Sequence, residues 1–199
     1  MRRYSVVALM VAVGATACNP PGETPAAAQQ TATVVDSALP REVAIARFRT
    51  CCGRVDSLTG GASTRDALVR QFVRALETTD TAAFRGMLLN RDEFAWLYYD
   101  TSRQSLPPYN LSPALMWFLL EGNGSKGLAR AMDEYGGKPL GYLDYLCDEG
   151  ASVEGANTVV GPCNVRRLEA DGDTVQLRLF GLLIERRGRW KFISYGNKL

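Results

Sequence analysis

Hydrophobic residues recur with the period of an α-helix between residues 63 and 77. Polar or charged side chains occupy most of the positions between them, which predicts an amphipathic helix of about four turns. Ser63, followed three residues later by Asp66, is typical of a helix start. The apolar face consists of Leu68, Val69, Phe72, Val73 and Leu76.

Two shorter helical segments follow with almost no linker. Asp80 is positioned to cap the first, and Asn90 with Glu93 is typical of a capping box at the start of the second. Three helical segments therefore precede a loop at Pro107-Pro108. The apolar residues of the two shorter segments are Phe84, Met87 and Leu88, then Phe94, Leu97 and Tyr98.

A longer helix is predicted to begin at Ser112 and Pro113, because serine is a favoured N-cap and proline a favoured first helical residue. Gly122 and Gly124 are expected to kink or interrupt this helix, since glycine weakens a helix interior. The pair Gly136-Gly137 predicts its end.

From Pro139 onward the hydrophobic period changes to two, which is typical of β-strands. Turn residues at Asp171-Gly172-Asp173 and Arg187-Gly188 join the last three segments. Helices followed by strands predict an α+β fold, with N-terminal helices packed on a curved antiparallel meander. The predicted strands are residues 140–147, 158–168, 175–185 and 189–195.

Residues 1–17 have the composition of a secretory signal peptide. Arg2 and Arg3 precede an apolar run too short to span a bilayer, and small residues at 15–17 lead directly into Cys18. Two interpretations are open: Cys18 carries a lipid, as in bacterial lipoproteins, or residues 15–17 form the cleavage site of a freely secreted protein. The first predicts a protein of the cell envelope, anchored to a bacterial membrane and facing the periplasm or the exterior.

Residues 18–58 are interpreted as lipid attachment and a flexible tether with a short ordered lead-in. The stretch 19–40 is rich in Pro, Ala, Thr and Gln and has no aromatic residue, so it buries too little apolar surface to fold. Residues 59–199 are long enough for one α+β domain with a sizeable core.

The charge of the chain predicts no strongly charged partner. The 23 Lys and Arg lose Arg2 and Arg3 with the signal peptide, which leaves 21 against 21 Asp and Glu. No long-range field then attracts nucleic acid, and none is expected to bind. The sequence contains no histidine, the commonest zinc ligand and the usual general base at neutral pH. It also has no glycine-rich phosphate loop, so we expect neither a metal nor a cofactor.

Three short motifs mark the helices and the last strand. They are Arg65-Asp66-Ala67-Leu68, Asp80-Thr81-Ala82-Ala83-Phe84 and Gly188-Arg189-Trp190-Lys191-Phe192. With the order of elements over residues 63–199, they resemble the nuclear transport factor 2-like (SnoaL-like, cystatin-like) superfamily, and the chain as a whole resembles bacterial lipoproteins built on that domain. The resemblance implies a cone-shaped domain with a pocket between helices and sheet. It selects no function, because members include dehydratases, isomerases, polyketide cyclases and proteins without catalysis.

Four aromatic residues are candidates for lining such a pocket: Trp117, Phe118, Tyr98 and Tyr142. Aromatic side chains can surround an apolar ligand. The same helical and strand spacing also fits a plain hydrophobic core, so both interpretations stay open.

A cluster of carboxylates and tyrosines occupies residues 92–100. Asp92, Asp100 and Tyr99 could support chemistry like that of ketosteroid isomerases, which needs an aspartate base in an apolar pocket and an acidic donor opposite. In the alternative, which we favour, Asp92 and Glu93 complete a helix N-terminus, the tyrosines are ordinary core-edge residues, and no residue is catalytic.

Four cysteines remain if Cys18 is acylated, and they allow three disulfide pairings. Cys147 ends one predicted strand and Cys163 lies in the next, so a disulfide between these two is the natural choice. The adjacent Cys51 and Cys52 can pair with each other only with strain, and the alternative is that both remain thiols.

Together the patterns favour an envelope-tethered, non-catalytic domain that binds a small apolar ligand or a partner protein. The first alternative is an isomerase, cyclase or dehydratase-like enzyme that uses carboxylate and tyrosine groups. The second is a structural module that forms a homodimer through the open face of its sheet. A pocket without a buried carboxylate favours the binding domain over the enzyme.

The interpretation of Cys18 predicts the outcome of a single substitution. Cys18→Ala should abolish incorporation of labelled fatty acid and move the mature protein from the membrane fraction to the soluble fraction. Labelling of the wild-type protein is the reference. A wild-type protein that takes up no labelled fatty acid would contradict the lipoprotein interpretation.

Overall fold

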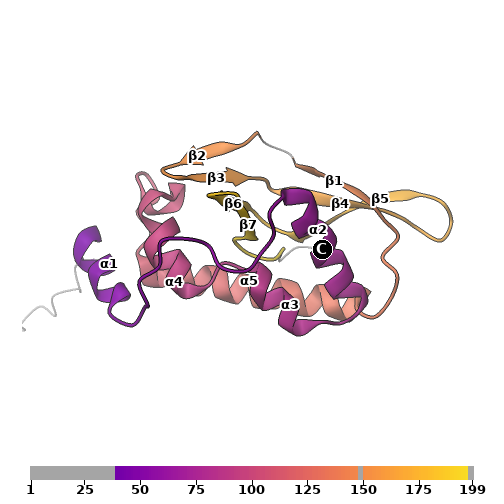
Figure 1. The fold of residues 1–199 in the computed structure, drawn as a ribbon, viewed down its shortest axis with the longest axis horizontal. Helices are drawn as coiled ribbons and strands as arrows, with labels where there is room; N and C mark the ends of the chain where they lie inside the picture. The colour runs from indigo at the N-terminus through magenta and orange to yellow at the C-terminus, as the bar shows by residue number, and fades with distance from the viewer. Residues whose placement is uncertain (1–38, 148–149, 197–199) are drawn as a thin grey trace, which may run out of the picture. The chain divides into compact units, whose positions relative to one another are not determined.

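The computed structural model describes residues 39–147 and 150–196. The predicted signal peptide, the lipid site at Cys18 and the tether up to residue 38 lie outside the described residues. The described part forms five α-helices and two antiparallel sheets, with α3, α4 and α5 on one side of the strands (Figure 1). The α+β class expected from the sequence is confirmed.

Polar caps begin the first three predicted helical segments. The side chain of Thr64, one residue after the expected Ser63, accepts a hydrogen bond from Ala67 N at 3.1 Å and caps the first. Asp80 accepts hydrogen bonds from two backbone N–H groups of the second, and Asn90 forms the predicted capping box with Glu93. The helices are α2 (Arg65–Glu77), α3 (Thr81–Met87) and α4 (Arg91–Glu93), and α4 continues into the π-helical turn Phe94–Tyr98 and the 3₁₀ turns Tyr99–Thr101 and Arg103–Ser105.

Helix α5 (Pro113–Tyr135) begins at the expected Ser112 cap and ends at the expected Gly136. The predicted interruption at Gly122 and Gly124 is wrong, because the helix is continuous through both. The glycines of α5 instead allow close packing. A Cβ atom on Gly127 would lie 1.9 Å from the carbonyl oxygen of Gly196, so the chain after the last strand can cross α5 only over a glycine.

Helix α1 (Arg41–Arg49) lies in the segment for which the sequence predicted only a short ordered lead-in. It has an acidic residue, Glu42, in its first turn and arginines in its last, an arrangement that the helix dipole favours. Ile45 and Phe48 are buried. The core of the fold therefore includes side chains from before residue 59.

The strands form one meander that is bent into two sheets. The predicted strands 158–168 and 175–185 are each divided, the first at Gly161-Pro162 and the second at Gly181-Leu182. The two breaks lie opposite each other in the strand register. Pro162 has no N–H to donate across the strands, so the pairing is interrupted at that point. One sheet has the order β1 (Tyr142–Cys147), β4 (Cys163–Leu168), β5 (Thr174–Phe180), and the other β2 (Ser152–Glu154), β3 (Asn157–Val160), β6 (Leu183–Arg186), β7 (Arg189–Phe192).

Aromatic side chains fill the space between the helices and the strands. Phe72 on α2 lies 5.3 to 5.6 Å, centroid to centroid, from the rings of four residues of α3, β5, β7 and the chain after β7. All five rings are buried, and edge-to-face contacts of this kind stabilise a core beyond their buried area. The four partners of Phe72 are Phe84, Phe180, Phe192 and Tyr195.

The cysteines are arranged as the strand pattern predicted. Cys147 pairs with Cys163 in the β1–β4 register, and their sulfur atoms lie at disulfide distance, 2.08 Å. Cys51 and Cys52 are free thiols. The disulfide links the end of β1 to β4 across a sequence separation of 16 residues.

A buried ion pair joins α4 to the sheet. Glu93 is 0% exposed and Lys191 on β7 is 2% exposed, and Lys191 Nζ donates to Glu93 Oε2 at 2.7 Å. Glu93 Oε2 also accepts from Asn90 N at 3.0 Å, while Glu93 Oε1 accepts from Thr59 N at 2.7 Å and from Thr59 Oγ1 at 3.0 Å. The carboxylate is therefore fully occupied by structural contacts.

Loss of the Glu93 charge should destabilise the protein. Glu93→Gln leaves the Lys191 ammonium buried without a counter-charge, and breaking such a pair costs about 3 to 5 kcal/mol of unfolding free energy, measurable by urea denaturation at pH 7. Adding Lys191→Met removes the unpaired charge and should restore part of the loss. Asp66→Asn, which breaks the exposed Arg70–Asp66 pair, should leave the urea midpoint unchanged and serves as the control.

The loss in Glu93→Gln should shrink as the pH rises. Burial lowers the pKa of Lys191 from 10.5, and the Glu93 carboxylate opposes that shift. Without the carboxylate the pKa of Lys191 falls further. Lys191 of the folded variant then releases its proton at a pH where the unfolded chain still keeps it. The unfolding free energy of the variant therefore rises with pH between these two pKa values. A deficit of the same size at pH 7 and at alkaline pH would contradict this explanation.

Gly127 and Gly122 should respond oppositely to substitution. Gly127→Ala forces a methyl group into the backbone of Gly196 and should cost about 1 to 3 kcal/mol of unfolding free energy. Gly122 has no atom within 4 Å of an added Cβ, so Gly122→Ala should stabilise the helix by about 0.5 to 1 kcal/mol. Thermal or urea unfolding measures both. Equal effects at the two positions would contradict the packing role of Gly127.

Candidate functional site

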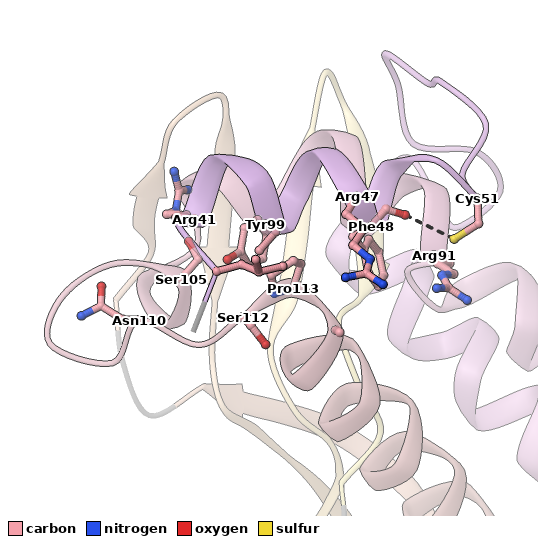
Figure 2. Close-up of a pocket in the computed structure, with 13 residues that line it drawn as sticks. Arg41, Arg47, Phe48, Cys51, Arg91, Tyr99, Ser105, Asn110, Ser112 and Pro113 are labelled. Carbon is pink, nitrogen blue, oxygen red and sulfur yellow. Dashed lines mark hydrogen bonds between the residues drawn. The ribbon is translucent and has the colours of Figure 1, made fainter. Parts of the chain in front are cut away.

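An open cleft of about 710 Å³ lies beside α1. One wall is α1 itself, and the opposite wall is the segment 105–114, which leads into α5 (Figure 2). Its volume is in the range of small-molecule sites. The lining residues are Leu39, Arg41, Ala44, Arg47, Phe48, Cys51, Arg91, Tyr99, Ser105, Asn110, Ser112, Pro113 and Ala114.

The inner surface of the cleft is mainly apolar. Phe48 points from α1 into the core, where its ring makes an edge-on contact with Phe94 at 5.6 Å. Ala44, one helical turn before it, adds a small side chain on the same face of α1, and Pro113 and Ala114 face it from the first turn of α5. The small size of both alanines leaves the space between the two helices open.

Hydrogen bonds to the chain after α4 hold α1 in place. The Arg49 guanidinium donates to the backbone oxygen of Ala95 at 3.0 and 2.7 Å and to Asp100 Oδ2 at 2.5 Å. Arg41 donates to the backbone oxygen of Asp100 at 2.6 Å. These contacts fix both ends of α1, so the cleft is a formed feature rather than the gap beside a loose helix.

Tyr99 connects the two walls. Its ring lies under the Arg41 guanidinium, and its hydroxyl donates to the backbone oxygen of Leu111 at 3.0 Å. Burial raises the pKa of Tyr99, so the phenol stays protonated and keeps this hydrogen bond at neutral pH. The hydroxyl is committed to a structural acceptor.

The border of the cleft is basic. Arg41, Arg47 and Arg91 all line it, and none of its described lining residues is acidic. Arg41 is partly neutralised by Asp100, whose Oδ1 lies 3.8 Å from its guanidinium. Arg47 and Arg91 are exposed, and no described carboxylate lies within ion-pair distance of either.

The thiol of Cys51 lies at the same end of the cleft as Arg47 and Arg91 (Figure 2). It donates to the backbone oxygen of Phe48 at 3.2 Å, which Cys52 also approaches, at 3.5 Å. Burial, followed by the contact with Cys51, raises the pKa of Cys52. A raised pKa disfavours the thiolate that redox or metal chemistry needs. Nowhere do the described residues gather three or more potential metal ligands.

The four aromatic pocket candidates do not meet in one cavity. Trp117 is half-buried, with its ring 5.3 Å from that of Phe94, while Phe118 is 69% exposed on the outside of α5. Tyr98 is buried in the core beside Phe94, and Tyr142 lies on β1. None of the four lines the cleft.

The three residues of the enzyme alternative, Asp92, Asp100 and Tyr99, do not form a catalytic group. Asp100 is exposed and paired with Arg49, and Asp92 accepts a hydrogen bond from Gly53 N at 3.1 Å. Tyr99 is the only one of the three that lines the cleft, and its hydroxyl bonds to a backbone carbonyl. The described residues place neither carboxylate in the cleft beside the tyrosine.

A second, more polar groove of about 500 Å³ lies between α2 and β1. Three of its charged side chains form ion pairs: Arg70 pairs with Asp66 at 2.8 Å, and Asp144 pairs with Arg166 of the neighbouring strand. Arg65 donates to the Tyr145 hydroxyl at 2.9 Å. Three of the four charged residues that line this groove are therefore paired with an opposite charge, and the fourth, Arg65, donates to a phenol.

Apart from Tyr99, the residues of the cleft were not predicted from the sequence, because α1 was assigned to the lead-in. The signal was present but weak: Ala44 and Phe48 stand one turn apart, Glu42 suits the first turn, and two arginines suit the last. The contacts that position this short helix join residues 46 to 59 positions apart. No local pattern indicates them.

Comparison of the chain with protein families, with curated proteins and with solved structures finds no match. None of the helices in the described ranges has the length and hydropathy to cross a membrane.

Proposed function

We propose that this protein is an envelope-tethered, non-catalytic domain that binds a small apolar molecule in the cleft beside α1. The observation that carries the proposal is a cleft of about 710 Å³ with an apolar inner surface and no acidic residue among its described lining residues. Pockets that bind small molecules are mostly apolar, with a few polar groups that set orientation.

The tether is supported by the sequence around Cys18. Leu39 and Arg41 line the cleft, so the cleft lies at the end of the folded part that the tether enters. A chain of about 20 residues that is as flexible as the composition of residues 19–40 predicts has a root-mean-square length of about 25 Å. A lipid on Cys18 would then hold the cleft close to a membrane surface, where apolar molecules partition.

The proposed fold family is the nuclear transport factor 2-like superfamily. It is supported by the order of elements, with α2, α3 and α5 before a bent antiparallel meander. The resemblance implies a pocket between helices and sheet. Phe72 and its aromatic neighbours occupy that space, and for this reason we assign the ligand to the cleft formed by the additional helix α1.

The enzyme alternative has less support. A carboxylate base needs a desolvated position facing an acidic donor, and Asp100 is 46% exposed and paired with Arg49. Glu93 is buried, but four hydrogen bonds hold it in a structural role.

Filling the cleft should remove binding. The neutral apolar fluorophore N-phenyl-1-naphthylamine should bind the protein saturably, and Ala114→Trp should weaken that binding at least about tenfold, because the indole occupies the space between α1 and α5. Ser125→Trp, at an exposed position of the same helix, is the matched control and should bind as the wild type does. A cooperative thermal unfolding transition in each variant confirms that it is folded before the titration.

Two results would contradict the proposal. One is the absence of saturable binding to the wild-type protein. The other is equal affinity of the wild type and the Ala114→Trp variant, which would place the fluorophore elsewhere.

A further inference from the structure

We infer that the ligand of the cleft is an anionic amphiphile, with its carboxylate or phosphate group at Arg47 and Arg91 and its hydrocarbon part on the apolar surface between α1 and α5. This inference rests on the proposed function and names the class of ligand. It follows from three observations: two arginines with no described carboxylate within ion-pair distance, the contact of one of them with the apolar surface, and a neutralised opposite end.

The first observation concerns charge. Arg47 and Arg91 lie at the same end of the cleft, on the side of Cys51 (Figure 2). Each is exposed, and neither has a carboxylate within ion-pair distance among the described residues. Two guanidinium groups beside one cleft repel each other, and an anion between them removes that repulsion and accepts charge-assisted hydrogen bonds.

The second observation concerns the junction of charge and apolar surface. The Arg91 guanidinium carbon lies 4.7 Å from the centroid of the Phe48 ring, which forms part of the inner surface. An anionic group bound to Arg91 would therefore lie next to the apolar surface that Phe48 forms. An inorganic anion would use the arginines and leave Phe48, Pro113 and Ala114 uncovered. A neutral apolar molecule would leave the arginines unpaired.

The third observation concerns direction. Arg41 lies at the opposite end of α1 from Arg47, about 9 Å away along the helix axis at 1.5 Å per residue. Its guanidinium is already bonded to the backbone of Asp100 and lies 3.8 Å from the Asp100 carboxylate. Of the three arginines that line the cleft, Arg47 and Arg91 are the two without a carboxylate within ion-pair distance in the described part of the chain. The anionic group belongs at their end, and the chain extends along α1 toward Ala44 and Leu39.

Matched amphiphiles test the inference by calorimetric titration below their micelle concentrations. The ligands are decanoate, decyl phosphate, 1-decanol and decyltrimethylammonium, with inorganic phosphate as the anion without a chain. Decanoate and decyl phosphate should bind about 10- to 100-fold more tightly than 1-decanol, which is the range for a hydrogen bond to a charged group. Decyltrimethylammonium and phosphate alone should bind weakest.

The Arg47→Gln/Arg91→Gln double variant should reduce the affinity for decanoate to that for 1-decanol and leave the affinity for 1-decanol unchanged. The matched control is Arg74→Gln/Arg85→Gln, which makes the same change in charge at two exposed positions of α2 and α3 outside the cleft. That control should keep the preference for decanoate.

The outcomes separate this inference from the proposed function. Equal binding of decanoate and 1-decanol to the wild type, both abolished by Ala114→Trp, would overturn the anionic class and keep the cleft as a binding site. Tight binding of inorganic phosphate alone would indicate a simple anion site and overturn the amphiphile. An unchanged decanoate affinity in Arg47→Gln/Arg91→Gln would overturn the position of the head group. If no ligand of the series binds while N-phenyl-1-naphthylamine does, the anionic amphiphile is overturned and the cleft stays a binding site; if neither binds, both proposals fail.

Discussion

The buried ion pair between Glu93 and Lys191 joins α4 to β7 of the sheet. Because the Glu93 carboxylate also accepts hydrogen bonds from the chain before α2 and from its own helix cap, α4 has one position relative to β7. The residues that follow α4 provide the acceptors for Arg49, the backbone of Ala95 and the Asp100 side chain. Since Arg49 holds α1, and α1 is one wall of the cleft, we expect the shape of the cleft to depend on an ion pair whose two residues do not line it.

Much of the fold could be predicted from local sequence, because caps and periodicity act over a few residues. Asp80, the Asn90 and Glu93 pair and Ser112 begin helices as expected. The bend of the sheet was missed, although Gly161-Pro162 contained its signal. The role of Gly127 could not be predicted, since it depends on the approach of Gly196 from the far end of the chain.

The candidate site was harder to predict than the fold. Large aromatic residues drew attention to Trp117 and Phe118, but aromatic side chains serve a core as readily as a ligand. The cleft instead depends on small residues, Ala44 and Ala114, that leave space, and on arginines that have no described carboxylate within ion-pair distance. The volume of a cleft and the ion-pair partners of an arginine are set by the folded chain, so a local sequence pattern does not reveal them.

The most direct test of the account is a crystal structure of the protein with bound decanoate. We expect the carboxylate within hydrogen-bond distance of Arg47 or Arg91 and the hydrocarbon chain against Phe48 and Ala114. Decanoate bound between α2 and the sheet, or on the exposed face of α5 around Phe118 with the cleft empty, would contradict it.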